Sequence, residues 1–331
     1  MVAAFNDTYH LLLDPIDTRL WMKLSVLCLF LGGGATSAAF HWALSALPGE
    51  LGGADVMAHL RVFLARHPTL LLLATALAIA LGITLVYLRA LFRFALVDSI
   101  LRREAHLHGA IRELRPVAGS YFRWLLGALV VMGLTLAAGA LVALPSLRAA
   151  SGQSLTPSIF VAAILLAEAL IGFLAALGIT LTDDLVVPII YAERLTVLPA
   201  WRRLLEKLRG EAGAFTLYIL LRFVVSVGVG IAVLFFLFPA LVALFSGAII
   251  VAVVVVMALH LVGLAWVWNP VTVVLAGAAV LLFMALLLTL MGVAGMPGQV
   301  FLQTFGLRFM AARVPALAQL WQALTAQDQS E

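Results

Sequence analysis

One acidic side chain lies deep within an apolar stretch of this sequence. Glu168 is near the middle of residues 158–181, which are otherwise almost entirely apolar. A charge at the centre of a bilayer costs about 2.5–3.5 kcal/mol on insertion scales, so an acid there must be protonated, face other helices or find a partner. With His260 or His41 it could bind an ion or a proton. Its commoner role is structural, as a neutral acid in an interhelical hydrogen bond worth about 1 kcal/mol.

A set of charged residues is predicted to meet at the cytoplasmic end of the helices. It comprises Arg89, Arg93, Asp98, Asp183, Asp184 and Arg222. The two adjacent aspartates end one apolar stretch, and Arg222 lies about two turns into a later one, from which its long stem can reach back to the boundary. Such a cluster could gate a pathway or hold helix ends together. The sequence favours the clamp.

The same residues do not indicate enzyme chemistry. Magnesium diphosphate sites need carboxylates that recur about one turn apart, whereas Asp183 and Asp184 are followed by the apolar residues 185–187. A nucleophile at Ser246 would be about 21 Å along one helix from His260, too far for the two side chains to act together. We therefore predict no catalytic residue.

The composition predicts that these residues lie on membrane-spanning helices. The chain has 331 residues, of which 64% are hydrophobic and 11% are charged, whereas soluble domains are about half apolar and about a quarter charged. The apolar residues form blocks of about 20, the length of a helix that crosses a hydrocarbon core about 30 Å thick. Residues 70–88 are apolar on every face, which excludes the alternating strands of a membrane barrel. We predict an all-α fold, a polytopic integral membrane helical bundle.

Six spans are predicted to form a single transmembrane domain over residues 1–331. They cover residues 20–44, 69–88, 121–144, 158–181, 215–237 and 271–291. Residues 241–268 form either a re-entrant element or a seventh span, and the sequence from Trp266 to Pro270 is typical of a turn at the membrane interface. Asp7, Asp14 and Asp17 precede the first block where a signal peptide would be basic, so we expect that block to be retained as an anchor.

The positions of arginine predict the orientation of these spans. Basic residues concentrate in residues 89–123 and 194–209, whereas the opposite connections carry only Arg61, Arg66 and Arg148. Both basic segments and the N-terminus should therefore be cytoplasmic, in a multi-pass protein of the bacterial inner membrane. The side of the C-terminus depends on whether residues 241–268 cross.

Residues 69–144 and 158–237 resemble each other at an offset of about 90 residues. Arg103 and Glu104 align loosely with Glu193 and Arg194, and an aromatic residue opens the following span in each case. A parallel repeat of this kind implies a pseudo-two-fold axis along the membrane normal, as in some transporters. The alternative is convergence of two basic cytoplasmic loops.

The second basic segment is predicted to form an amphipathic helix at the cytoplasmic interface. Its apolar side comprises Leu198, Trp201, Leu204, Leu205 and Leu208, and its basic residues are Arg202, Arg203, Lys207 and Arg209. The basic residues could contact anionic lipid headgroups at about 1 kcal/mol each. The alternative, which the sequence favours, is a topology determinant that merely rests at the surface.

Metal and nucleic-acid sites are not expected. Glu104, His106 and His108 would face different sides of a helix, and no further ligand cluster accompanies them. The basic loops are short and close to apolar stretches, so topology already accounts for their charge. We expect no cofactor, and we expect partners to be membrane lipids and other membrane-protein subunits or further copies of the chain.

Short motifs in the chain resemble a family of uncharacterised bacterial multi-span membrane proteins. The motifs are DDLVVPIIYAE at residues 183–193, AWRR at 200–203, PID at 15–17, GGG at 32–34, Arg222 and FLQTFG at 301–306. This family is related to the membrane domain attached to some glycerophosphodiester phosphodiesterases. The resemblance implies a six-helix membrane bundle with the Asp-to-Arg segment on the cytoplasmic side. It implies no activity, since the chain lacks the phosphodiesterase domain.

These observations predict a non-enzymatic scaffold or accessory subunit of a membrane assembly. Visible catalytic chemistry is lacking, and long apolar surfaces are available to pack against other helices. The alternative is a transporter or channel for a small or lipid-like molecule that uses the intramembrane Glu168. An enzyme acting on lipid headgroups near Asp183, Asp184 and Arg222 is a third hypothesis.

Overall fold

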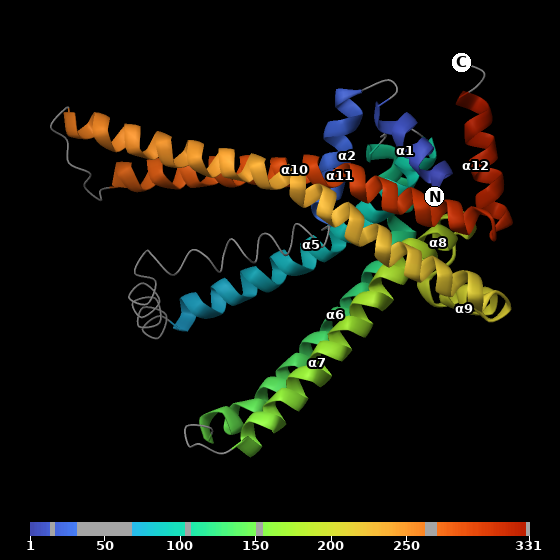
Figure 1. The fold of residues 1–331 in the computed structure, drawn as a ribbon, viewed down its shortest axis with the longest axis horizontal. Helices are drawn as coiled ribbons and strands as arrows, with labels where there is room; N and C mark the ends of the chain where they lie inside the picture. Colours follow the sequence, from blue (N-terminus) through green and yellow to red (C-terminus); the bar gives the residue numbers. More distant parts are fainter. Residues whose placement is uncertain (14–16, 32–67, 103–106, 150–154, 262–269, 329–331) are drawn as a thin grey trace. The chain divides into compact units, whose positions relative to one another are not determined.

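The computed structural model describes residues 1–13, 17–31, 68–102, 107–149, 155–261 and 270–328, and within these ranges all regular secondary structure is helical, without strands. The elements are α1 (Val2–Leu13), α2 (Thr18–Leu31), α5 (Pro68–Arg102), α6 (Leu107–Ala149), α7 (Leu155–Leu181), the π-helix η1 (Thr182–Val186), α8 (Val187–Glu193), α9 (Val197–Gly210), α10 (Ala212–Leu261), α11 (Pro270–Ala311) and α12 (Pro315–Asp328). Figure 1 shows these elements coloured along the chain. The all-α fold predicted from the sequence is confirmed.

Within the described ranges, five helices are long and apolar enough to cross a membrane, which is compatible with a membrane protein. They cover Leu71–Arg102, Arg112–Ala143, Val161–Glu193, Ala212–Ala258 and Leu281–Ala311. Of the predicted first span, 20–44, the structure describes the part that belongs to α2, up to Leu31. The turn predicted around Trp266 and the glycines at 32–34 lie outside the described residues.

α10 differs from the prediction in one respect. It is continuous for 50 residues, with Pro239 inside it, where the sequence suggested separate elements over 215–237 and 241–268. Proline is tolerated in long apolar helices because neighbouring groups and local adjustment can satisfy the carbonyl that it frees. No re-entrant turn therefore falls between residues 237 and 241, while the number of spans stays a prediction.

The chain forms two compact units, divided at residues 71–72, around 103–106, at 213–214 and at 305–306. The first unit comprises α1, α2, most of α10 and most of α11. Its helices approach closely at two glycines of α11: a side chain at Gly292 would meet the backbone of Ser25 in α2, and one at Gly298 would collide with Val229 of α10. Small residues of this kind let apolar helices pack against each other.

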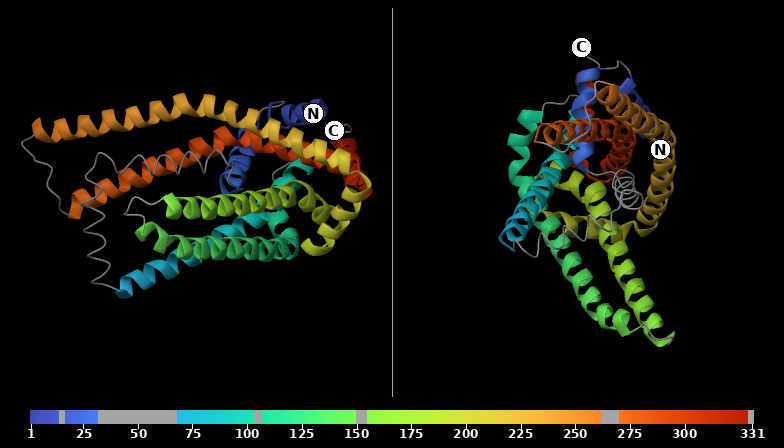
Figure 2. Two further views of the ribbon diagram at one scale, coloured as in Figure 1. Left: turned by 60° about the horizontal axis from the view of Figure 1, so that its bottom comes forward. Right: turned by 90° about the vertical axis from the view of Figure 1, so that its left-hand side faces the viewer.

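The second unit comprises most of α5, all of α6 to α9, and α12. α6 and α7 pack along each other as a hairpin, and they run side by side in all three views (Figures 1 and 2). η1 contacts α7, α8 and α9, and α12 packs on α8. The core of this unit lies where these short elements meet α5 and α6, and its fully buried side chains include Phe94, Leu114, Tyr121, Ile189 and Leu204.

Candidate functional site

The site is built on a local widening of the helix that follows α7. Residues Thr182–Val186 form the π-helix η1, in which the Val187 N–H bonds to the Thr182 carbonyl five residues earlier. Pro188 explains the widening, because its ring would clash with the carbonyl four residues before it in a regular α-helix and its nitrogen has no hydrogen to donate. The Thr182 hydroxyl donates to the Gly178 carbonyl at 2.7 Å. As a result, Asp183 and Asp184 are both held on the buried side of the segment.

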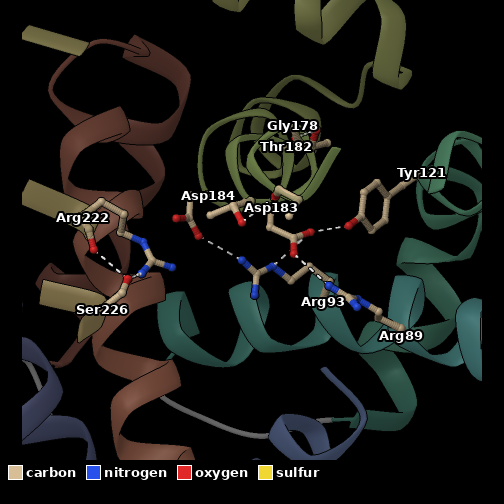
Figure 3. Close-up of polar contacts among 11 residues, drawn as sticks. Arg89, Arg93, Tyr121, Gly178, Thr182, Asp183, Asp184, Arg222 and Ser226 are labelled. Atoms are coloured by element: carbon tan, nitrogen blue, oxygen red, sulfur yellow. Dashed lines mark hydrogen bonds and ion pairs between the residues drawn. The ribbon is translucent and has the colours of Figure 1, made fainter. Parts of the chain in front are cut away.

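Arg93 of α5 compensates both aspartates at once. Its Nη2 lies 3.1 Å from Asp184 Oδ1, its Nε lies 3.7 Å from Asp183 Oδ1, and its side chain is only 12% exposed. Arg89, one turn earlier, lies 3.5 Å from Asp183 Oδ2 but is 34% exposed. In Figure 3 the Arg93 guanidinium points toward both carboxylates. Two buried anions therefore face two cations, and Arg93 is the better shielded of the two.

Tyr121 of α6 joins the same cluster. Its hydroxyl donates to Asp183 Oδ1, and its ring lies against Phe94 of α5 in an edge-to-face contact with centroids 5.9 Å apart. Tyr121 is fully buried, so its hydroxyl needs an acceptor within the protein. The phenol thus connects α6 to η1, and the cluster ties α5, α6 and η1 together at one level.

A second buried carboxylate, Asp98, lies further along α5. It accepts a hydrogen bond from the Tyr191 hydroxyl of α8 at 2.6 Å and from Arg102 Nε at 3.0 Å. Arg102 also approaches Glu113 of α6, with 4.0 Å between Nη2 and Oε2. The end of α5, the beginning of α6 and α8 therefore meet within the second unit, and the middle of the first basic segment lies close to the residues just before the second.

α8 ends in a backbone conformation that is uncommon for a side-chain-bearing residue. Arg194 has φ 52° and ψ 32°, the left-handed region that glycine usually occupies after a helix. Its guanidinium carbon lies 5.7 Å from the centre of the Tyr191 ring. This sharp stop turns the chain into α9, which begins three residues later and returns along η1 and α8.

α9 presents two different faces. Val197, Ala200 and Leu204 are buried against the unit, whereas Leu198 is 70% exposed and Leu205 is 46% exposed. The helix predicted over this segment is thus present, but two of its predicted apolar residues lie on the outside. Ala200, which the apolar pattern did not include, takes part in the buried face because its small side chain permits close contact with η1.

The four basic residues predicted as lipid contacts on α9 fall into two pairs. Arg203 lies 3.8 Å from Glu193, and Lys207 Nζ donates to the Arg313 carbonyl at 2.6 Å. Arg202 and Arg209 are exposed, and within the described part of the chain neither is paired with a carboxylate. Two of the four side chains therefore serve the protein's own structure.

A further set of contacts fixes the segment between α11 and α12. Arg313 Nε lies 2.8 Å from Glu211 Oε2, and its guanidinium stacks 3.9 Å from the centre of the Phe309 ring. Arg308 lies over the Trp321 ring of α12 at 4.8 Å. The ion pair holds the chain's C-terminal segment against the junction of α9 and α10, and the cation–π contacts lie within that segment, all in the second unit.

The remaining predicted site residues lie elsewhere. Arg222 is on α10 in the first unit, where it hydrogen-bonds to Ser226, and its membership of the charged cluster stays a prediction. His260 is exposed at the end of α10, while His41, Glu104 and His106 lie outside the described residues. Glu168 is half-buried on α7, against Gly139 of α6. Its Oε2 atom is buried and has no hydrogen-bond partner among the described residues.

Sequence reasoning missed the two tyrosines that complete the clusters. Tyr121 was visible only as the aromatic start of a span, and Tyr191 only as part of a motif. Both could have been found from one signal, namely a phenol at the boundary of an apolar stretch that needs an acceptor when it is buried. Which carboxylate each would reach depends on the π-helix, and no periodicity in the sequence marks that.

The fold and these clusters define a class of protein, an all-helical chain whose apolar helices are compatible with a polytopic membrane protein. A family model matches residues 1–320, and the chain belongs to that family, DUF7544, a family of unknown function. No curated protein and no solved structure matches the chain. The family assignment carries no activity, and a relation to the membrane domain of glycerophosphodiester phosphodiesterases stays a prediction.

Proposed function

We propose that this chain is a non-enzymatic scaffold or accessory subunit of a membrane assembly. The observation that carries the proposal is the contrast between a closed charge cluster and open apolar helices. Asp98, Asp183 and Asp184 are satisfied by arginines and tyrosines of the same unit. The helices that lead away from them expose large apolar side chains, such as Leu166 at 72% and Phe173 at 61%. The second unit is thus suited to fix its helices relative to one another and to present their apolar faces to a partner in the membrane.

The charge cluster fits a clamp better than a pathway. A gate or an exchange site needs a group that can release its partner at low cost, whereas loss of Arg93 would take the best-shielded cation from two buried carboxylates, and breaking a buried ion pair typically costs about 3–5 kcal/mol. Tyr121 and Tyr191 add hydrogen bonds from two further helices. The arrangement favours one fixed geometry of α5, α6 and α8.

The exposed apolar faces supply the surface for assembly. In α7 they include Leu165, Leu166 and Leu170, and in α6 Val130 and Val131. Lipid alone can cover such faces, so exposure by itself does not identify a partner. A scaffold predicts that one face is covered by another membrane protein, and that this face can be altered without disturbing the clamp.

The test is to extract the full chain in native nanodiscs and to identify what accompanies it. We expect a stoichiometric membrane-protein partner. Leu166→Trp on the exposed face should release the partner while the thermal unfolding temperature stays unchanged, and Leu198→Trp, equally exposed but on α9, is the matched control. Recovery of a lone, monodisperse monomer with bound substrate would overturn the proposal.

Transport is the second candidate, and Glu168 is the observation that favours it. A carboxylate that packs against Gly139, with a buried oxygen lacking a partner in the described chain, is poised to hold a proton or a cation. Under this hypothesis Glu168→Gln abolishes flux or substrate binding in proteoliposomes while the protein still inserts. Glu206→Gln, an exposed acid on α9, is the matched control. Unchanged flux in Glu168→Gln would remove this candidate.

We also propose the orientation and the lipid contacts of the protein. The basic ends of α5 and α6, together with α9, face the cytoplasm, as does the N-terminus, in a bacterial inner membrane. Arg202 and Arg209 then contact anionic headgroups, while Arg203 and Lys207 remain with Glu193 and the Arg313 carbonyl. The motif from Asp183 to Glu193 supports a common origin with the membrane domain of the glycerophosphodiester phosphodiesterases.

A further inference from the structure

An open hollow lies on α5 and α6, and none of the residues that line it belongs to the buried charge cluster. Its volume is about 480 Å³, and it is lined by Tyr87 of α5 and by Arg112, Arg115, Pro116, Gly119 and Arg123 of α6. Arg112, Pro116, Gly119 and Arg123 recur at intervals of three or four along α6, and Arg115 lies four residues before Gly119, so the set occupies one stripe of the helix. Three arginines therefore face a single hollow.

The charge of the hollow is of one sign. No carboxylate lines it, and in the part of the chain that the structure describes none of its three arginines is paired with an acid. Glu113, the acid closest to them along α6, is directed instead toward Arg102, at 4.0 Å. Guanidinium groups are planar forks with several donors, and their preferred unpaired ligands are phosphate and carboxylate. The hollow is thus complementary to an anion.

The walls of the hollow fit an amphiphilic ligand. Tyr87 offers a ring and a hydroxyl, and its ring meets Phe122 edge to face with centroids 5.4 Å apart. Tyrosines with one wet end and one apolar end are typical of headgroup depth in membrane proteins. From Tyr87 toward the N-terminus, α5 exposes Leu85 and Ile83, and α6 exposes Val130 beyond Arg123. An anion bound in the hollow would therefore have apolar helix surfaces beside it.

We propose that this hollow binds the phosphate headgroup of an anionic phospholipid, with Arg112, Arg115 and Arg123 as its donors and the neighbouring helix surfaces against its acyl chains. The site is independent of the accessory role proposed above and is separate from α9. Each basic group near a membrane surface contributes about 1 kcal/mol, so removal of one arginine should weaken binding about fivefold.

Gly119 gives the proposal a test that leaves charge unchanged. A Cβ built on Gly119 meets no atom within 4 Å, so a larger side chain fits the fold and fills the hollow instead. Leucine also favours a helix more than glycine does. Gly119→Leu should therefore keep the protein folded and exclude the headgroup, whereas a site that depended only on diffuse positive charge would bind as before.

The experiment measures lipid binding to the full-length protein in neutral detergent by native mass spectrometry, with phosphatidylglycerol and phosphatidylcholine as probes. We expect selective retention of phosphatidylglycerol, about fivefold weaker in Arg115→Gln and reduced in Gly119→Leu to the weaker binding that the exposed arginines of α9 retain. Arg203→Gln removes the same charge at the Glu193 ion pair and should bind as the wild type does. Circular dichroism and gel filtration check that each variant is folded.

Three results would overturn the proposal. One is equal binding by Gly119→Leu and the wild type, and another is an equal loss in Arg115→Gln and Arg203→Gln, which would indicate attraction by overall charge. The third comes from a competition arm with inorganic phosphate and glycerol phosphate. If these displace phosphatidylglycerol at comparable concentration, the hollow binds a soluble phosphate and the lipid assignment is wrong.

Discussion

Two regions of the second unit differ in what they bury: the region around η1 buries charged side chains, whereas the α6–α7 hairpin exposes apolar ones. At the end where η1 lies, carboxylates are buried and each is matched by arginine or tyrosine from another helix. Along the α6–α7 hairpin, by contrast, apolar side chains are exposed and Glu168 keeps a buried oxygen without a described partner. Desolvated charges must be paired, whereas exposed apolar side chains cost nothing when the solvent is lipid. Substitutions in the charge cluster should therefore lower the free energy of unfolding strongly, whereas substitutions on the exposed apolar face should change it little.

The largest difference is expected at the charge cluster. Arg93→Ala leaves Asp183 and Asp184 without their best-shielded cation and should lower the free energy of unfolding by about 3–5 kcal/mol. The measurement is chemical unfolding in detergent micelles, followed by circular dichroism. Arg89→Ala is the control, because this side chain is more exposed, and its loss should cost no more than about 1 kcal/mol. Equal effects of the two substitutions would contradict the clamp.

The tyrosines should give an intermediate effect. Tyr191→Phe removes the hydroxyl that donates to Asp98 and leaves a buried carboxylate with one donor fewer, which should cost about 1–3 kcal/mol. Tyr121→Phe should cost a similar amount, through Asp183. Tyr87→Phe is the matched control, since Tyr87 is half-buried and its ring contact with Phe122 survives. A fully neutral Tyr191→Phe would show that Asp98 is satisfied without the phenol.

A third prediction concerns the packing of the hairpin. Gly139→Leu places a side chain where the Glu168 carboxylate lies, and overpacking of this kind typically costs about 1–3 kcal/mol. Gly133→Leu, on the same helix but with open space around it, should be neutral or slightly stabilising. Thermal unfolding of both variants in one detergent distinguishes them. If they unfold at the same temperature, α6 and α7 do not approach at Gly139.

The smallest effect is expected on the exposed apolar face. Leu166→Ala should change the free energy of unfolding by no more than about 0.5 kcal/mol. The Leu166 side chain is exposed, so its truncation opens no cavity inside the protein. The buried Leu204→Ala of α9 is the contrast and should cost about 2–5 kcal/mol. A large loss in Leu166→Ala would mean that this face packs against protein in the isolated chain.

Composition and the length of the apolar blocks were enough to predict the all-helical fold. The positions of Arg89, Arg93, Asp183 and Asp184 at the ends of apolar stretches also predicted a charged cluster, and these four residues do lie together. This prediction has a physical basis, because charged side chains at the boundary of an apolar block must either reach water or pair with opposite charges.

Other features could not be read from the sequence. The π-helix at Thr182–Val186, which follows from the clash of one proline ring, positions Asp183 for the Tyr121 hydroxyl and changes the register of Tyr191 beyond it. The continuity of α10 past Pro239 depends on satisfaction of the freed carbonyl rather than on hydropathy. On α9, Arg203 is paired with Glu193 while Arg202 is exposed and unpaired among the described residues. This difference depends on which side of α9 packs against η1.

The central claim is that the apolar helices span a lipid membrane and that the two basic segments lie on the same side of it. The most direct measurement is labelling with an impermeant thiol reagent in sealed membranes, with Cys28, the single native cysteine, replaced by alanine. Single cysteines are then placed by Arg112→Cys, Ser151→Cys and Arg209→Cys. We predict that the first and third react from the cytoplasmic side and the second from the other side. Reaction of Arg112→Cys and Arg209→Cys from opposite sides would contradict the account.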